Sequence, residues 1–132
     1  FEENDYKSTD SASTGAGAAD VIIDLHTTTT TMGTTLIVGE GDPLMTQAAA
    51  YVMKKCGAQD NVCILMHTHK NQKERPHLSS IAPHSFSVEV GSVPQGVLRH
   101  DTVEKTQRAL AAVLEFLERH NRRQPPHQRS DA

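Results

Sequence analysis

The stretch VIIDLHTT, residues 21–28, decides the fold, because an apolar run of strand-forming residues ends there in an acid, a histidine and hydroxyl side chains. Side chains alternate along a strand, so Asp24 and His26 share one face, opposite the face that carries Ile23. In open α/β sheets, ligands gather where parallel strands end, which makes His26 a natural functional position. From spacing alone two interpretations stay open: His26 binds a metal with Asp24 beside it, or His26 hydrogen-bonds a loop carbonyl.

Composition limits the class of protein. The 132 residues are one domain's worth of chain, and with 4% aromatics and no tryptophan the core must be built from Val, Ile, Leu and Ala. A formal net charge of −3 gives no electrostatic reason to expect nucleic acid or an anionic membrane as a partner. No run approaches the about 20 apolar residues that a membrane helix needs.

Cysteine content and the N-terminal sequence bear on the compartment. Two cysteines, Cys56 and Cys63, do not make a disulfide framework, and we expect both to be reduced. The chain shows no signal peptide, and its start without Met suggests an excised fragment. We therefore expect a cytoplasmic protein, and association into a homo-oligomer stays open.

The organisation along the chain is that of an α/β domain with a mixed, mostly parallel sheet flanked by helices. We expect a flexible or loop segment over 1–19, the α/β domain over 20–121 and a disordered tail over 122–132. Residues 67–80 are polar and charged and are typical of a long loop. Strands are predicted over 21–26, 35–38, 62–66 and 85–90, and the continuous apolar run 62–66 predicts a strand covered on both faces.

Two helices are predicted. Asp42 as the cap and Pro43 as the first residue begin the earlier helix, and Gly57 is expected to close it. The later helix runs over about 102–120, before Arg122, with Asp101 as its expected cap. Its amphipathic pattern predicts a buried stripe of Val103, Leu110, Val113, Leu114 and Leu117.

Glu89 is the second candidate for chemistry. It interrupts the alternating strand 85–90, in which Phe86, Val88 and Val90 share one face and the glutamate lies on the other. A carboxylate on a partly covered sheet face suits a general base, although an edge-strand glutamate turned to water has the same pattern. His26 and Glu89 together fit metal-assisted hydrolysis, but a catalytic zinc normally needs three protein ligands.

Other residues are weaker candidates for a functional role. His67 and His69 could place two imidazoles on one face, or they simply open a solvated loop. Arg75 could hold a substrate carboxylate through its planar guanidinium. Arg99 and Asp101 are expected to form a local ion pair or cap, and none of the threonines at 27–31 has a base beside it that would make it a nucleophile.

Two segments carry a resemblance to a known family. The residues DLHTT at 24–28 with Met32-Gly33 resemble the DLHNTT…MG segment of the aspartoacylase and aminoacylase-3 family. The residues EVG at 89–91 with PQGVLR at 94–99 resemble its EVG…PQGVLR segment. Order and separation both match, and the likeness extends from about Asp20 through the last helix. The wider superfamily includes succinylglutamate desuccinylases and, more remotely, zinc carboxypeptidases.

The resemblance implies a fragment of a zinc-carboxypeptidase-like catalytic domain and a zinc-dependent hydrolase of N-acyl amino acids. In this comparison His26 matches a zinc-binding histidine, and Asp24 matches the strand acid that supports the site. Glu89 matches the catalytic carboxylate that activates water and passes its proton to the leaving amine. The implied cofactor is Zn²⁺ and the implied partner is a small N-acyl amino acid.

The departures from the family pattern concern the missing ligands and the substrate. The family's HGxE-type zinc loop and its substrate-binding Asn-Arg residues lie upstream of the DLH strand, and nothing before Asp20 contains them. The family's C-terminal β domain is also absent, and Thr27 replaces the usual Asn. An arginine that holds the substrate carboxylate in aspartoacylase corresponds to Ser79 here, for which Arg75 is the only candidate replacement that we identify.

The sequence therefore predicts the central part of an amidohydrolase that releases a carboxylate and a free amino acid. With one zinc ligand of three, we expect the 132-residue chain itself to be inactive or very weak. Two alternatives stay open. One is a degenerate family member that binds a partner through the loop 67–80 or the final helix without turnover, and the other is an enzyme whose acyl donor is an ester.

Overall fold

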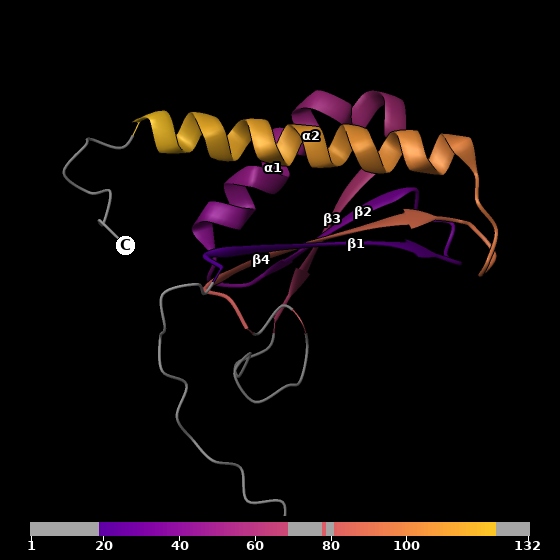
Figure 1. Ribbon diagram of the computed structural model, residues 1–132, viewed down its shortest axis with the longest axis horizontal. Helices are drawn as coiled ribbons and strands as arrows, with labels where there is room; N and C mark the ends of the chain where they lie inside the picture. Colours follow the sequence, from indigo (N-terminus) through magenta and orange to yellow (C-terminus); the bar gives the residue numbers. More distant parts are fainter. Residues whose placement is uncertain (1–18, 69–77, 79–80, 124–132) are drawn as a thin grey trace, which may run out of the picture.

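The computed structural model describes residues 19–68, 78 and 81–123. Strands and helices follow the order β1, β2, α1, β3, β4, α2 (Figure 1). The strands are β1 (Val21–Thr28), β2 (Thr34–Gly39), β3 (Val62–His67) and β4 (His84–Gly91), and the helices are α1 (Pro43–Asp60) and α2 (His100–Arg123). Most of the predicted segment 1–19, and the tail from residue 124, lie outside the described residues.

The four strands form one sheet in the order β1-β4-β2-β3. The pairs β1–β4 and β2–β3 are parallel, and β2 and β4 pair antiparallel in the centre. The prediction of an α/β fold with a mixed, mostly parallel sheet is confirmed. In the described part of the chain, both helices lie over the same face of this sheet (Figure 1). The other face carries the residues on which the functional argument rests.

The prediction that the strand at 62–66 is covered on both faces is wrong for the described residues. β3 stands at the edge of the sheet, and Leu65, on the face away from the helices, is 47% exposed. The apolar run arises because the two faces of β3 are used differently. Ile64 packs against the buried core, whereas Leu65 lines a hollow on the open face.

The core lies between the helices and the sheet. Phe86, Val88 and Val90 of β4 are almost completely buried, which confirms the predicted alternation of this strand. They meet small and apolar side chains from both helices, as expected for a chain without tryptophan. The other members of the core are Leu36, Val38, Met45, Ala48, Ala49, Val52, Cys56, Ala109, Ala112 and Val113.

Helix α1 begins as predicted and ends later than predicted. The Asp42 side chain accepts a hydrogen bond from the Met45 backbone amide at 3.0 Å, and Pro43 is the first residue of the helix. Gly57 does not close the helix, which continues to Asp60. Asn61 takes the left-handed conformation that ends it, with φ 49°. Asparagine tolerates this conformation better than most residues, so it replaces the expected glycine.

Helix α2 is longer than predicted, and its buried stripe is shifted. It starts at His100 and continues through Arg123, so the predicted end before Arg122 is wrong. Asp101 lies inside the first turn, so its predicted role as the cap is wrong, because the helix already begins at His100. It forms the expected local pair with Arg99, whose Nη2 donates at 2.6 Å to the carboxylate. This guanidinium holds the pKa of the Asp101 carboxyl below its usual range. The fully buried positions of the helix are Thr102, Ala109, Ala112 and Val113.

The buried residues of α2 differ from the predicted ones because of how the helix packs. Of the predicted residues Val113 is buried, but Val103 is 36% and Leu114 is 52% exposed. Ala109 and Ala112 are small, so their burial lets the helix backbone approach its neighbours closely. The predicted residues Leu110 and Leu117 are half-buried, and Leu117 packs against the core. Both cysteines are free, as predicted, and burial raises the pKa of the Cys56 thiol. Neither helix is long and apolar enough to cross a bilayer in the described part of the chain.

An ion pair between a buried carboxylate and a partly exposed guanidinium joins the end of α1 to α2. The Asp60 side chain is 1% exposed, and both of its oxygens accept hydrogen bonds from Arg108, at 2.7 and 2.9 Å. Removing one partner of such a pair leaves an uncompensated buried charge. This bidentate contact therefore fixes how the two helices pack together.

We expect Arg108→Met to destabilise the chain by about 3 kcal/mol, because the Asp60 carboxylate would stay buried without its partner. The control is Arg122→Met, which removes a solvent-exposed pair with Glu118 and should change stability by less than about 0.5 kcal/mol. Urea unfolding followed by circular dichroism measures both. Equal losses of stability in the two variants would contradict the stabilising role of the Arg108–Asp60 ion pair.

Candidate active site

The register of β1 and β4 brings the two main candidates together. His26 on β1 is the direct partner of Glu89 on β4. Both side chains lie on the face away from the helices, because the neighbouring Val88 on the opposite face is buried in the core. Asp24 lies two residues before His26 on the same strand and therefore on the same face. The structure thus gathers all three residues on the open face of the sheet.

The imidazole of His26 lies close to both carboxylates. Its Nε2 atom is 3.6 Å from Oδ2 of Asp24 and 3.6 Å from Oε1 of Glu89. These distances are within the range of ion pairs but too long for direct hydrogen bonds. The side chains of His26, Asp24 and Glu89 are 44%, 37% and 26% exposed. The three groups are therefore open to water and small ligands, and two negative charges face one ring nitrogen.

A glycine fixes this end of the two strands. A Cβ atom on Gly91 would lie 2.4 Å from the carbonyl oxygen of Thr30 and 2.5 Å from that of Thr28, so no larger residue fits there. The Gly91 amide donates to the Gly33 carbonyl at 3.0 Å, and the Val93 amide donates to the Thr28 carbonyl at 2.9 Å. This close approach holds the ends of β1 and β4 together directly beyond His26 and Glu89.

Sequence reasoning missed two side chains in the same row of the sheet. Thr35 of β2 is the partner of Glu89, and Cys63 of β3 is the partner of Thr35. The Thr35 hydroxyl and the Cys63 sulfur are 3.3 Å apart. The row His26, Glu89, Thr35 and Cys63 therefore crosses all four strands. Only the pairing of β2 with β4 reveals it, and no local pattern predicts that pairing.

A hollow of about 400 Å³ adjoins the two carboxylates, and we call it the sheet-face pocket. Asp24 and Glu89 line one part of it. Apolar side chains, serines and a histidine of β2, β3 and β4, together with Leu78, line the rest. These other lining residues are Ile37, Val38, Gly39, Leu65, His67, Leu78, Ser85 and Ser87.

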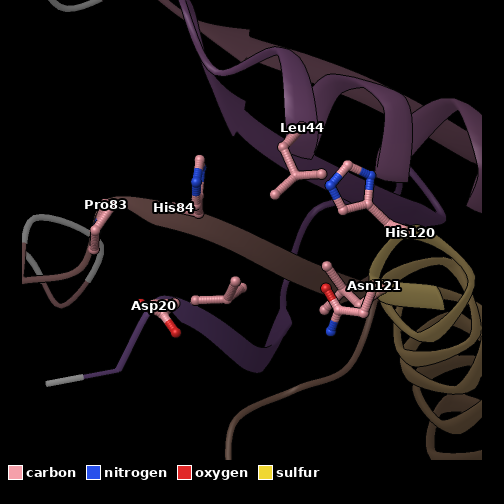
Figure 2. Close-up of a pocket in the computed structure, with 8 residues that line it drawn as sticks. Asp20, Leu44, Pro83, His84, His120 and Asn121 are labelled. Atoms are coloured by element: carbon pink, nitrogen blue, oxygen red, sulfur yellow. The ribbon is translucent and has the colours of Figure 1, made fainter. Parts of the chain in front are cut away.

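A larger cavity of about 530 Å³ lies where β1 and β4 begin, on the side of the helices (Figure 2). Leu44 of α1 and His120 of α2 approach it from above and from the right in this view, and Asp20 lies below. Its other histidine, His84, is held by Asp42, with Nδ1 3.1 Å from both carboxylate oxygens. None of the three candidate residues lines this cavity, whereas Asp24 and Glu89 line the sheet-face pocket, which is therefore the candidate active site.

The side chains around His26 are of the types that bind zinc, but they do not form a complete set of ligands. One exposed imidazole nitrogen beside two carboxylates matches the ligand types of zinc sites. Within residues 19–68, 78 and 81–123, however, no three His, Cys, Asp or Glu side chains form a group that could hold a metal. His26 can therefore supply one ligand. His69, Arg75 and Ser79 lie outside the described residues, and the predictions that concern them stay predictions.

Comparison with known families gives a match over most of the chain. The family model described as "Succinylglutamate desuccinylase/Aspartoacylase catalytic domain" matches residues 7–117. The match begins upstream of Asp20, where the sequence likeness was expected to start. It includes the strands that carry Asp24, His26 and Glu89, and it ends within α2.

Similar curated proteins and solved structures agree with this match. The chain is 35% identical over 100 residues to an N-acyl-aromatic-L-amino acid amidohydrolase (carboxylate-forming) of Xenopus laevis, covering 76% of the chain and 33% of that protein. It is 37% identical over 107 residues to an aspartoacylase of Danio rerio, covering 81% and 34%. A crystal structure of murine aminoacylase 3 superposes with a TM-score of 0.64 and 27% identity, covering 82% and 35%. The chain thus spans about a third of the length of these relatives.

We expect isothermal titration of the 132-residue chain with Zn²⁺ to show no tight one-to-one site. The reason is that His26 is one imidazole without two further ligands among the described residues. A His26→Ala variant should give the same weak isotherm as the parent chain. Nanomolar one-to-one binding that this substitution abolishes would contradict the prediction and would require ligands among the residues not described.

Proposed function

We propose a function from the premise that this chain belongs to the succinylglutamate desuccinylase/aspartoacylase catalytic-domain family. The full-length protein is a zinc-dependent amidohydrolase that cleaves N-acyl amino acids into a carboxylate and a free amino acid. This chain supplies the general base and one zinc ligand. Two of its relatives are named aspartoacylase and N-acyl-aromatic-L-amino acid amidohydrolase, which supports hydrolysis of an acyl–nitrogen bond.

One observation carries the proposal. The parallel pairing of β1 and β4 brings an imidazole and a carboxylate within 3.6 Å of each other on an exposed sheet face, beside a pocket large enough for a small substrate. A carboxylate in such a place can exchange protons with a bound water or amine. An imidazole at a strand end can bind a metal ion through its exposed ring nitrogen.

Glu89 moves the proton in this proposal. Its carboxylate accepts a proton from the water whose oxygen forms the new bond to the acyl carbon. The same carboxylate then gives that proton to the amide nitrogen as the carbon–nitrogen bond breaks. The oxygen keeps its second hydrogen and stays on the acyl group, which leaves as a carboxylic acid, and the nitrogen leaves as the amine of the amino acid. The acid then gives that second proton to the released amine or to solvent water, so the products are a carboxylate and an ammonium group or hydronium, and atoms and charges balance.

His26 would hold the zinc ion, together with ligands supplied by residues not described here. When bound, zinc polarises the acyl carbonyl and lowers the pKa of water. Asp24 lies beside the same ring nitrogen as Glu89, so its charge strengthens the attraction of His26 for a cation. Because the resemblance matches Asp24 to the strand acid that supports the site, we assign it a positioning and electrostatic role rather than proton transfer.

We expect Glu89→Gln in the full-length protein to lower kcat for N-acyl amino acids about 10²–10⁴-fold, because the amide cannot accept the proton from water. Bound zinc should remain. Glu118→Gln, on the exposed side of α2, is the matched control and should keep full activity. A Glu89→Gln enzyme with normal kcat would exclude the proposed role. A folded wild-type protein that cleaves no N-acyl amino acid would favour the non-catalytic alternative, and cleavage of esters alone would favour the ester alternative.

We expect His26→Ala to remove bound zinc from the full-length protein, as measured by elemental analysis. Asp24→Asn should act more weakly, with about a 10- to 100-fold loss of zinc affinity or activity, because it changes only the surroundings of the ligand. Unchanged zinc content in His26→Ala would exclude this residue as a ligand. A loss in Asp24→Asn as large as in His26→Ala would contradict its assignment as a supporting residue.

A further inference from the structure

We propose that Thr28 is a further catalytic residue, whose hydroxyl donates a hydrogen bond to the acyl oxygen of the substrate. Thr28 belongs to the run of five threonines at 27–31. The inference rests on the proposed function, because it takes Glu89 as the proton carrier beside the reacting carbon. Three observations support it: the place of Thr28 on the sheet, the path of the chain after β1, and the hydrogen bonds of the Thr28 hydroxyl.

The place of Thr28 on the sheet is next to both proposed functional groups. It follows His26 by two residues on β1, so it shares the open face, and it pairs with Gly91, two residues beyond Glu89. Strand geometry separates the Cα atoms of Thr28 and Glu89 by about 8 Å. A water molecule and the acyl carbon with its oxygen can span a gap of this size. A substrate beside Glu89 is therefore within reach of Thr28.

The chain after β1 folds over the open face of the sheet. The Cβ position of Gly91 would point to that face, like the side chain of Glu89. It lies 2.5 Å from the carbonyl oxygen of Thr28 and 2.4 Å from that of Thr30. Residues 28–30 therefore form a wall of the site, directly beyond the proposed proton carrier.

The contacts with Thr30 can direct the hydrogen of the Thr28 hydroxyl to the substrate. The Thr28 hydroxyl oxygen accepts the Thr30 backbone amide at 3.3 Å, and the two hydroxyl oxygens are also 3.3 Å apart, with either direction allowed. A hydroxyl has two lone pairs and one hydrogen. In the proposal, the amide and the hydroxyl of Thr30 fill both lone pairs, which leaves the hydrogen of Thr28 to be donated. A hydroxyl that accepts hydrogen bonds is itself a stronger donor.

A donor at this position assists the reaction more than it assists substrate binding. The acyl oxygen gains negative charge as the water oxygen adds to the acyl carbon, and a hydrogen bond to a charged oxygen is stronger than one to a neutral carbonyl. An interaction that strengthens in the transition state raises kcat. Thr28 keeps its proton throughout, so the proton transfers assigned to Glu89 are unchanged.

The test uses the full-length protein loaded with zinc, and N-acetyl-L-aspartate or N-acetyl-L-phenylalanine, whichever the wild type cleaves faster. Thr28→Val keeps the branched shape and removes the hydroxyl. It should lower kcat about 10- to 100-fold, as expected for a lost hydrogen bond to a charged group, and should change KM less than about threefold. Thr28→Ser keeps the hydroxyl and loses only the χ1 restriction, so its kcat should stay within about threefold of wild type. Wild-type kcat in Thr28→Val, or a loss as large in Thr28→Ser, would overturn the inference.

Two neighbouring threonines provide matched controls. Thr29→Val makes the same change at the exposed next residue, beyond the end of β1, and should leave kcat unchanged. Thr30→Val removes the hydroxyl that fills one lone pair of Thr28 but keeps the amide that fills the other, so it should lower kcat less than Thr28→Val. A larger loss in Thr30→Val would assign the donated hydrogen to Thr30. Equal losses in all three variants would indicate a general disturbance of the loop, and either result would overturn the inference.

Zinc content and thermal unfolding distinguish contact with the substrate from a structural role. Thr28→Val should keep the wild-type zinc content by elemental analysis, and its Tm should lie within about 2 °C of wild type, as for other substitutions outside the core. A fall in kcat that is matched by a loss of zinc or of folded protein would overturn the inference, because Thr28 would then act through the structure alone.

Comparison with Glu89→Gln separates failure of this inference from failure of the proposed function. Normal kcat in Thr28→Val together with a large loss in Glu89→Gln would leave the proposed function standing and overturn the role of Thr28. Normal kcat in both variants would overturn both. A folded wild-type protein that cleaves neither acetyl derivative nor any other N-acyl amino acid would also overturn both.

Discussion

The parallel pairing of β1 with β4 is the constraint on which the rest of the site depends. His26 and Glu89 are far apart in the sequence and meet only because this register makes them partners. Side chains alternate along a strand, so a shift of one residue in β4 would turn Glu89 into the core and bring a valine beside His26. The close approach at Gly91, where no Cβ atom fits against the carbonyl oxygens of Thr28 and Thr30, opposes such a shift. One glycine therefore protects the spacing between the imidazole and the carboxylate.

One face of the sheet packs the hydrophobic core, and the other face carries the candidate site residues. On the face under α1 and α2, the side chains of Leu36, Phe86 and Val88 are completely buried. The opposite face carries Asp24, Glu89 and Ser87 next to exposed leucines. A substitution on the open face removes little core packing, so its effect on the site can be measured without a large loss of stability. Placing the polar groups there also avoids the cost of burying two carboxylates beneath the helices.

Local patterns predicted much of this arrangement, and long-range pairing accounts for most of what they missed. Alternation in residues 21–28 and 85–90 correctly placed Asp24, His26 and Glu89 on the face opposite the core. Capping chemistry correctly located the start of α1 at Pro43. The antiparallel contact between β2 and β4 leaves no local signal, so Thr35 and Cys63 escaped notice. The end of α1 was missed because Gly57 is a frequent helix terminator, yet Asn61 takes the left-handed conformation here. The buried stripe of α2 was misplaced because close helix packing selects Ala109 and Ala112 over larger neighbours.

The charges around His26 provide a reason for a cation at this site that does not depend on likeness to any relative. Two carboxylates lie 3.6 Å from the same ring nitrogen, and each repels the other unless positive charge stands between them. A proton on the imidazole offers one compensating charge, whereas a divalent metal ion offers two. Metal binding requires the neutral imidazole, so proton and metal compete for the same nitrogen. In the proposed function, the charge that lets Glu89 accept a proton also makes the neighbouring imidazole attractive to a metal ion, so the proposed base and the proposed metal ligand depend on each other's charge.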